Sequence, residues 1–395
     1  MVLNFRFASI PNIIFGAGKL SELFNIIANF GKNVLYVIGG SSLKTSKKWD
    51  EITSEMFRRA INFYSISIPG EPTPFLIDDA VKKFRQKNLD LIIGIGGGSV
   101  IDAGKAISAM IPKNDSIKEY LEGVGDKKHD GKKIPYIAIP TTSGTGSEAT
   151  KNAVITEVGS NGYKKSLRHD NLIPNYAIVD PKLVLSCPPS ITAACGMDAF
   201  TQLLEAYVSP RSSPMTDVLA YSGINQIKDN IIPVYAQKSS DLKTRSAMAY
   251  GSLISGIVLA NAGLGIVHGL ASSIGGLYNI SHGTVCGTLL AESTKMNVKR
   301  LDQIGFDGEH GLLKYAMIGK LIAGKDYDAN MDVPYYCSVL IETLESWTKQ
   351  LKLEPLGKYG ITPKDVEKIV KKTELKNNPV HLKPEDITEI VANRI

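Results

Sequence analysis

The feature that most constrains the fold is an alternation of short β-branched runs with helical patterns, in which the runs stop at glycine-rich turns. These runs are Val34–Ile38, Leu89–Ile95, Ile134–Ile139 and Ala177–Asp180. Apolar runs of about four to eight residues that are separated by helices are typical of buried parallel strands. We therefore predict an α/β N-terminal domain built on a parallel sheet.

From about Pro189 the pattern changes to longer segments with a 3.6-residue period. Several of them begin with residues that favour helix starts: Ser190-Ile-Thr192, Ser213-Pro214, Thr362-Pro363 and Lys383-Pro384. A chain of 395 residues also suits two domains better than one core. We therefore expect an α/β domain over residues 1–187 and an all-helical domain over residues 188–395.

Charge and cysteine usage exclude several classes of protein. Forty-five Lys and Arg against 39 Asp and Glu leave a net charge of +6 with no basic stripe, so we expect neither a nucleic-acid partner nor a membrane partner. Cys187, Cys195, Cys286 and Cys337 lie far apart with no C-x-x-C pair, which argues against a disulfide framework and a zinc knuckle. With no signal peptide evident, reduced thiols indicate a cytoplasmic protein.

The stretch from Ser246 to Ala291 contains no Asp, Glu, Lys or Arg. A membrane hairpin is one interpretation, but Ser, Gly and Asn interrupt the stretch, and no unbroken apolar run reaches about 18–20 residues. Helices buried in the middle of a large domain are the interpretation that we favour. His268 and His282 lie in this stretch and would then be buried.

Gly96-Gly97-Gly98-Ser99 lies where a predicted parallel strand feeds a helix. Without side chains there, backbone N–H groups can approach a phosphate, and the helix N-terminus adds partial positive charge. The spacing is not the G-x-G-x-x-G fingerprint, because Ser99 stands in place of the third glycine, and it is not a P-loop, because Ala106 follows Lys105. Taken alone, the motif fits a nucleotide site or a merely tight turn.

A second loop, Pro140–Glu148, places hydroxyls and glycines at the carboxyl end of another predicted strand. Open α/β sheets bind their ligands at such ends. The hydroxyls could instead be helix caps, with Thr145 or Ser147 as the cap residue. Two loops that converge on one edge of the sheet favour the nucleotide interpretation.

Candidate metal ligands lie in the helical half. Asp198 and Gln202 are four residues apart and should share one face of a helix, while His268 and His282 lie in the charge-free stretch. Two imidazoles and one carboxylate in an apolar setting are a donor set for a catalytic divalent metal. The alternative is two hydrogen-bonded core histidines and a buried helix cap, and these residues alone leave both open.

Together the motifs resemble those of the iron-containing alcohol dehydrogenases, whose fold is shared by glycerol dehydrogenase and dehydroquinate synthase. The resemblance extends over essentially the whole chain. It rests on Phe15-Gly16-Ala17-Gly18, Gly96-Gly97-Gly98-Ser99-x-x-Asp102-x-x-Lys105, Pro140-Thr-Thr-x-Gly144-Thr-Gly-Ser-Glu148, Gly196-Met-Asp198-Ala199 and His268 to His282-Gly283. It implies a nucleotide domain, a helical domain, a cleft between them, hydride transfer between a nicotinamide and an alcohol or aldehyde, and a homodimer or larger homo-oligomer.

The resemblance also implies which residues hold the cofactor. Residues that match the pyrophosphate and nicotinamide positions are Gly97, Gly98, Ser99 and Asp102. Residues that match the adenosine-side loop are Thr141, Thr142 and Thr145. Lys164 matches a lysine that reaches the cofactor, and the adjacent Lys165 offers a second register.

The first turn bears on the choice of nicotinamide cofactor. NAD-preferring members of the family tend to carry an Asp there, whereas this chain has Gly39-Gly40-Ser41-Ser42 followed by Lys44, which resembles the NADP-preferring relatives. Hydroxyl and ammonium donors without a repelling carboxylate favour a 2′-phosphate. We expect NADP(H) in preference to NAD(H).

The chain departs from the family pattern at two positions. The family holds its metal with one Asp and three His, and the His expected four residues after the Asp is Gln202 here. Gln202 offers a neutral carbonyl oxygen, so we expect Asp198, Gln202, His268 and His282 to bind Fe²⁺ or Zn²⁺ with lowered affinity. A second His, thought to help with proton transfer, is Ser272. The proton then moves through water or the Ser272 hydroxyl, or the chemistry differs.

The leading hypothesis is a metal-dependent, NADP(H)-preferring alcohol dehydrogenase or aldehyde reductase that acts on a small alcohol or aldehyde. One alternative is a synthase or lyase similar to dehydroquinate synthase, which would need a strongly basic pocket. The stretch from Ser246 to Ala291 supplies no cation for one. The other alternative is a non-enzymatic nucleotide-binding relative, in which Gln202 and Ser272 mark a lost active site.

Overall fold

The computed structural model describes residues 4–237, 239–325 and 331–395. Within these residues, six parallel strands form one sheet in the order β1-β8-β5-β4-β2-β3. The strands are β1 (Asn12–Phe15), β2 (Asn33–Ile38), β3 (Asn62–Ser67), β4 (Leu91–Gly96), β5 (Tyr136–Pro140) and β8 (Tyr176–Val179). The predicted α/β half with a parallel sheet is thus confirmed, and the predicted runs shift by at most two residues at their ends.

Helices cover both faces of this sheet because its strands are apolar on both sides. Leu35 and Val37 of β2 pack toward α3 (Pro74–Phe84) and α4 (Gly98–Met110), whereas Val34, Tyr36 and Ile38 pack toward α1 (Leu23–Ile27) and α2 (Lys47–Arg58). Successive side chains of a strand point to opposite faces. The near-continuous apolar runs in the sequence therefore reflect burial on two sides.

The strand order decides which loops meet. Strand β4 lies between β5 and β2, and because all three are parallel, their carboxyl ends share one edge of the sheet. The turns after Ile38, Gly96 and Pro140 therefore emerge side by side. An antiparallel hairpin, β6 (Asn152–Glu157) and β7 (Tyr163–Arg168), follows the last of these turns.

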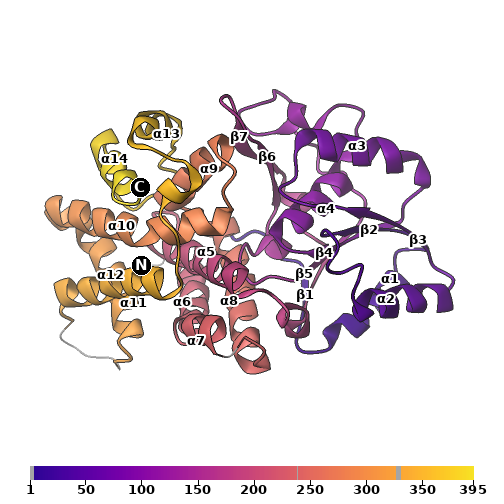
Figure 1. Ribbon diagram of the computed structural model, residues 1–395, viewed down its shortest axis with the longest axis horizontal. Coiled ribbons are helices and arrows are strands. Elements are labelled where there is room, and N and C mark those ends of the chain that lie inside the picture. The colour runs from indigo at the N-terminus through magenta and orange to yellow at the C-terminus, as the bar shows by residue number, and fades with distance from the viewer. Residues whose placement is uncertain (1–3, 238, 326–330) are drawn as a thin grey trace.

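The second half is helical, as predicted, and lies beside the sheet domain (Figure 1). Its helices are α5 (Pro189–Val208), α6 (Pro214–Lys228), α7 (Ile231–Ala236), α8 (Leu242–Ala262), α9 (Ile266–Leu277), α10 (His282–Gln303), α11 (Glu309–Ile322), α12 (Val333–Gln350), α13 (Val366–Lys372) and α14 (Pro384–Ala392). Helix α5 lies in the core, where Phe200 packs edge-on against Trp347 at 5.0 Å between ring centroids.

The charge-free stretch forms most of α8, all of α9 and the start of α10, and most of its side chains are buried. Among the described residues, no single helix is long and apolar enough to cross a membrane. Helices α8 and α9 taken together have the length and apolar composition of a membrane span, but they are bent by 99° relative to each other.

Candidate active site

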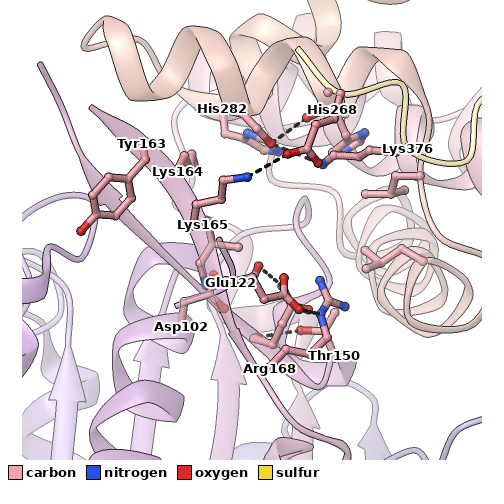
Figure 2. Close-up of a pocket in the computed structure, with 18 of the residues that line it drawn as sticks. Asp102, Glu122, Thr150, Tyr163, Lys164, Lys165, Arg168, His268, His282 and Lys376 are labelled. Carbon is pink, nitrogen blue, oxygen red and sulfur yellow. Dashed lines mark hydrogen bonds and ion pairs between the residues drawn. The ribbon is translucent and has the colours of Figure 1, made fainter. Parts of the chain in front are cut away.

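A cavity of about 1190 Å³ lies where the two halves meet. The α/β half contributes α4, the loop after β5 and the β6–β7 hairpin to its lining, and the helical half contributes α5, α8, α9, α10 and the segment after α13. Figure 2 shows His268, His282 and Lys376 on one wall, facing Asp102, Thr150 and Arg168 across the opening. The predicted cleft between the domains is therefore present.

The loops after β4 and β5 touch each other at the edge of the sheet. A Cβ atom built on Gly98 would lie 2.5 Å from Thr145 Cγ2, and one on Gly97 would lie 3.4 Å from the Thr142 side chain. Glycine is therefore required at position 98, because any side chain would separate the two loops. Helix α4 begins at Gly98, so its free N–H groups also point toward this edge.

The structure brings the predicted cofactor residues to one edge, but only some of them line the cavity. Those that do are Gly98, Ser99, Asp102, Thr145 and Lys164. Those that lie at the same edge outside its lining are Gly39, Gly40, Ser41, Ser42, Gly97, Thr141 and Thr142. The helix-cap interpretation is wrong for both residues, because Gly146 is the N-cap of the short 3-10 helix Ser147–Ala149 and no side chain among the described residues caps it; Thr145 Oγ1 accepts a hydrogen bond from Ser147 N at 3.3 Å within the turn.

Beneath these loops lies a buried charge cluster of Asp102, Lys105 and Glu148. Lys105 Nζ donates to Ser147 O, Thr150 Oγ1 and Asn152 O at 2.7–2.8 Å, so it ties α4 to the segment after β5. One ammonium group cannot neutralise two buried carboxylates. Burial therefore raises the pKa of Asp102 to about 6 and that of Glu148 to about 7.

Strand β7 places Lys164 and Lys165 with different partners. Lys164 Nζ lies 3.0 Å from Glu71 Oε2, and its side chain is largely buried. Lys165 Nζ lies 2.9 Å from Glu374 Oε1 and is more exposed. Of the two lysines, Lys164 is therefore the more buried.

Three of the four predicted metal ligands come together at the wall of the cavity that carries His268 and His282. Asp198 Oδ1 lies 3.4 Å from His268 Nε2 and 3.8 Å from His282 Nε2, although the three residues come from α5, α9 and α10. This carboxylate oxygen is buried without a well-aligned hydrogen-bond donor. An unsatisfied buried carboxylate oxygen between two imidazole nitrogens is chemically suited to a divalent cation.

The protonation states in this group follow from burial and charge. Burial alone would raise the pKa of Asp198, but the coulombic pull of His282 and the contact with His268 hold it below its usual value. Burial lowers the pKa of His282 to about 3. Against the effect of burial, Cys286, Glu205 and Asp198 raise the pKa of His268 well above its usual value. In the absence of a metal, the proton in this group is therefore held by His268. An ionised carboxylate and a neutral imidazole are the forms that bind metals.

Two residues of this site escaped the sequence analysis. Glu205, three residues after Gln202 on the same face of α5, lies 2.6 Å from His268 Nδ1. Cys286 follows His282 by one turn of α10, and its thiol joins Asp198, His268 and His282 in a group whose ligand atoms lie within 4.8 Å of one another. In the sequence, the only sign of their role is their helical spacing from Gln202 and His282. That spacing is informative only when His268 and His282 are known to lie close together.

Gln202 and Ser272 line the same cavity as His268 and His282, and each has hydrogen-bond partners of its own. Gln202 is 3% exposed, and its Oε1 accepts a hydrogen bond of 2.6 Å from Ser255 Oγ. Ser272 Oγ donates to the carbonyl of His268 at 2.8 Å and accepts from Lys376 Nζ at 3.3 Å. Lys376 has a φ of 54°, a backbone conformation that is uncommon for residues other than glycine.

The cavity is richer in cations than its charge-free helices suggested. Its lining includes Lys164, Lys165, Arg168 and Lys376, which come from β7 and the segment after α13. The expectation that the pocket lacks cations was therefore wrong. It considered only residues 246–291, whereas these cations come from other segments. Carboxylates offset part of this charge, because Arg168 Nε lies 2.7 Å from Glu122 and both lysines of β7 pair with glutamates.

Comparison with known proteins assigns both halves to one family. A family model described as iron-containing alcohol dehydrogenase matches residues 11–181, and the model of the C-terminal domain of the Fe-containing alcohol dehydrogenase family matches residues 192–395.

Individual relatives agree with this assignment. The chain is 32% identical to long-chain-alcohol dehydrogenase 1 of Geobacillus thermodenitrificans, with 97% of this chain and 96% of that protein covered. It is 31% identical to the NADPH-dependent butanol dehydrogenase of Clostridium saccharobutylicum (90% and 87%) and 27% identical to the NAD-dependent methanol dehydrogenase of Bacillus methanolicus (98% and 98%). The solved structure of an alcohol dehydrogenase from Oenococcus oeni superimposes with a TM-score of 0.86 at 25% identity, over 99% of this chain and 100% of that one.

Proposed function

Because this chain belongs to the iron-containing alcohol dehydrogenase family, we propose that it transfers hydride between NADP(H) and a small alcohol or aldehyde in the cavity between its two halves. The observation that carries the proposal is the opening of His268 and His282 onto the same cavity as Gly98 and Thr145. The donor group proposed for a metal and the turn proposed to bind phosphate therefore line one cavity.

The preference for NADP(H) rests on the turn after β2. Ser41, Ser42 and Lys44 are exposed there, and no carboxylate lies between Ile38 and Asp50 in the sequence. A 2′-phosphate would therefore meet hydroxyl and ammonium donors without a repelling charge. Among the relatives, one is named as NADPH-dependent and one as NAD-dependent, so the residues themselves carry this part of the proposal.

Asp198, His268 and His282 are the residues that would hold Fe²⁺ or Zn²⁺, with Gln202 as the fourth position predicted from the sequence. When bound, such an ion supplies Lewis acidity that stabilises negative charge on the substrate oxygen. Asp198 contributes the negative charge that neutralises part of the ion, and the two imidazoles contribute neutral donors. Glu205 orients His268 so that Nε2 faces the other ligands.

We assign proton transfer to Ser272. When an aldehyde is reduced, its oxygen must gain a proton as hydride reaches the carbon, and Ser272 lines the cavity together with His268 and His282. Ser272 would give its hydroxyl proton to the substrate oxygen and regain one from the ammonium group of Lys376, which already donates to Ser272 Oγ. Alcohol oxidation would move the proton in the opposite direction.

The test is NADPH oxidation with a panel of short, branched and polar aldehydes, using protein stripped by a chelator and reloaded with Fe²⁺ or Zn²⁺. We expect activity to return with metal. His282→Ala should abolish turnover while NADPH binding, followed by fluorescence, stays within a few-fold. An equal loss of both in a folded variant would count against the metal assignment.

Two other outcomes would replace this proposal. Turnover without a net change in the redox state of the cofactor would favour a chemistry similar to that of dehydroquinate synthase, for which the lysines of the cavity wall offer anion-binding groups. Metal-free purification with no rescue by Fe²⁺ or Zn²⁺, in protein that still binds NADPH, would favour a nucleotide-binding relative without activity.

We also propose that the functional division lies at residues 187/188, between the 3-10 helix Pro181–Val184, which follows β8, and α5. The matches of the two family models end at residue 181 and begin at residue 192, which supports this division. A cytoplasmic homodimer or larger homo-oligomer is part of the same proposal. Light scattering and cell fractionation test these two points.

A further inference from the structure

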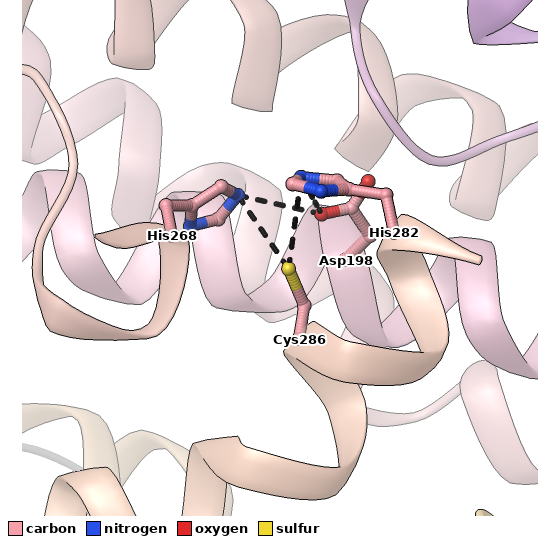
Figure 3. A group of neighbouring side chains, drawn as sticks. All are labelled: Asp198, His268, His282 and Cys286. Carbon is pink, nitrogen blue, oxygen red and sulfur yellow. Dashed lines mark hydrogen bonds and ion pairs between the residues drawn. The ribbon is translucent and has the colours of Figure 1, made fainter. Parts of the chain in front are cut away.

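The buried thiol of Cys286 faces the centre of the metal group. Its Sγ lies 3.8 Å from His268 Nε2 and 3.7 Å from His282 Nε2, and the side chain is 0% exposed. Figure 3 shows the Cys286 sulfur pointing toward His268 and His282, with the Asp198 carboxylate beside His282. The thiol thus points toward the same centre as the three predicted ligands.

The distances fit four donors around one ion. In a tetrahedral site with ligands about 2.0–2.3 Å from a metal, two neighbouring ligand atoms are about 3.3–3.7 Å apart. The four distances that join Asp198 Oδ1 or Cys286 Sγ to the two Nε2 atoms are 3.4, 3.8, 3.8 and 3.7 Å. Two of these distances lie within that range, and the other two are about 0.1 Å longer.

A buried cysteine is more often a small apolar core residue than a ligand. Two observations separate Cys286 from that case. The sulfur contacts the Nε2 atoms of His268 and His282, and it also lies beside the Asp198 carboxylate. The nearby Asp198 is buried, and its Oδ1 has no well-aligned hydrogen-bond donor, so this carboxylate oxygen is available to a cation.

Gln202 is less suited to complete the set. Its carbonyl oxygen already accepts a hydrogen bond from Ser255 Oγ, which occupies one of its two lone pairs. An amide oxygen is also a weaker donor than a thiolate for metals of the zinc class. The side chain is still buried on the same face of α5 as Asp198, which makes Gln202 the natural comparison for a test.

We propose that Cys286 binds the metal as a thiolate and is the fourth protein ligand in place of Gln202. The proposal rests on the metal site of the proposed function. Metal binding would release the thiol proton to solvent, and the sulfur–metal bond would form in its place. The donor set becomes one carboxylate, two imidazoles and one thiolate, which favours Zn²⁺ over Fe²⁺ because the thiolate is a soft ligand. The substrate oxygen would be a fifth donor.

Cobalt substitution tests the proposal directly. Co²⁺ bound by a thiolate has an intense near-ultraviolet charge-transfer band, which Co²⁺ bound only by oxygen and nitrogen lacks. We expect this band in metal-stripped wild-type protein loaded with Co²⁺ and in Gln202→Ala, and we expect it to be lost in Cys286→Ser. Cys337→Ser is the matched control, because it removes another buried thiol, on α12.

Zinc affinity, measured by competition with a chelator, gives a second readout. Cys286→Ser should weaken Zn²⁺ binding by roughly 10–100-fold, whereas Gln202→Ala should stay within a few-fold. Circular dichroism and NADPH binding show whether each variant is folded. If Cys286→Ser does not fold, the wild-type spectrum still decides the question.

The possible failures are distinguishable. Wild-type protein that binds Co²⁺ without the band would overturn thiolate ligation but leave the metal site of the proposed function intact. Loss of Zn²⁺ in Gln202→Ala but not in Cys286→Ser would return the fourth position to Gln202. Wild-type protein that binds neither Co²⁺ nor Zn²⁺ would overturn the proposed metal site and, with it, this proposal.

Discussion

His268 Nδ1 lies 2.6 Å from Glu205 Oε2, and both side chains are buried. The other oxygen, Glu205 Oε1, accepts the backbone N–H of Val267 at 2.7 Å. The carboxylate is therefore fixed at both oxygens, and the imidazole can turn only its Nε2 toward Asp198. Glu205 is thus a positioning residue for the metal group.

The first prediction concerns this pair. Glu205→Gln keeps the size and one acceptor but loses the charge that supports His268, so we expect Zn²⁺ affinity to fall by roughly 10–100-fold. Chelator competition measures the change, and NADPH binding should not move. Unchanged Zn²⁺ affinity in a folded variant would show that the pair has only a structural role.

A second prediction concerns proton transfer. Ser272→Ala should lower kcat for aldehyde reduction by roughly tenfold or more, with metal content and NADPH affinity unchanged. Lys376→Met should have a similar effect, and the double variant should be no slower than the worse single variant, because the two groups act in series. Ser273→Ala is the matched control, since its hydroxyl bonds Gly269 O and Thr373 instead. Wild-type kcat in Ser272→Ala would mean that water carries the proton.

A third prediction concerns the contact between the two cofactor loops. Gly98→Ala places a methyl group 2.5 Å from Thr145 Cγ2, so the loops must separate. We expect the KM for NADPH to rise roughly tenfold or more from this overpacking, while zinc binding is unchanged. Gly70→Ala is the control, because a Cβ there meets no atom within 4 Å. Equal kinetics in the two variants would contradict a cofactor role for this contact.

A fourth prediction concerns cofactor choice. Ser41→Asp adds a carboxylate in the turn after β2, where a 2′-phosphate would lie. Repulsion between the two charges should lower kcat/KM for NADPH by roughly tenfold or more, whereas the value for NADH should stay within a few-fold. The ratio of the two values is the measurement. A parallel fall for both cofactors would place the 2′-phosphate elsewhere.

A fifth prediction uses the buried Glu148. Burial raises its pKa from 4.5 to about 7, so the folded protein binds more protons than the unfolded chain between these pH values. The stability contributed by protonated Glu148 is present below about pH 4.5 and is lost as the pH rises to about 7. The stability of Glu148→Gln relative to that of the wild type should therefore rise by on the order of 2–3 kcal/mol as the pH increases from about 4.5 to about 7.

Thermal unfolding at several pH values measures this difference for Glu148→Gln. Glu342→Gln, an exposed change on α12, is the control and should show no trend. A constant difference between Glu148→Gln and the wild type across this range would mean that Glu148 is ionised throughout.

Much of the fold could be read from local pattern. The parallel strands were predictable because a strand buried on both faces must be apolar along its length, and the glycines after Ile38 and Ile95 mark where the strands end. Helix α5 was predictable from its period, as was the placement of Asp198 and Gln202 on one face of it. These features depend on residues that are close in the sequence, so the sequence by itself determined them.

The composition of the metal group depended on the tertiary structure. His268 and His282 lie on different helices, and only the angle between α9 and α10 brings their Nε2 atoms to Asp198. The same packing points the Cys286 thiol toward the two imidazoles and leaves the Gln202 side chain hydrogen-bonded to Ser255. Spacing along a helix tells which side chains share a face, but which faces meet is set by the packing of whole helices, and no local pattern encodes that.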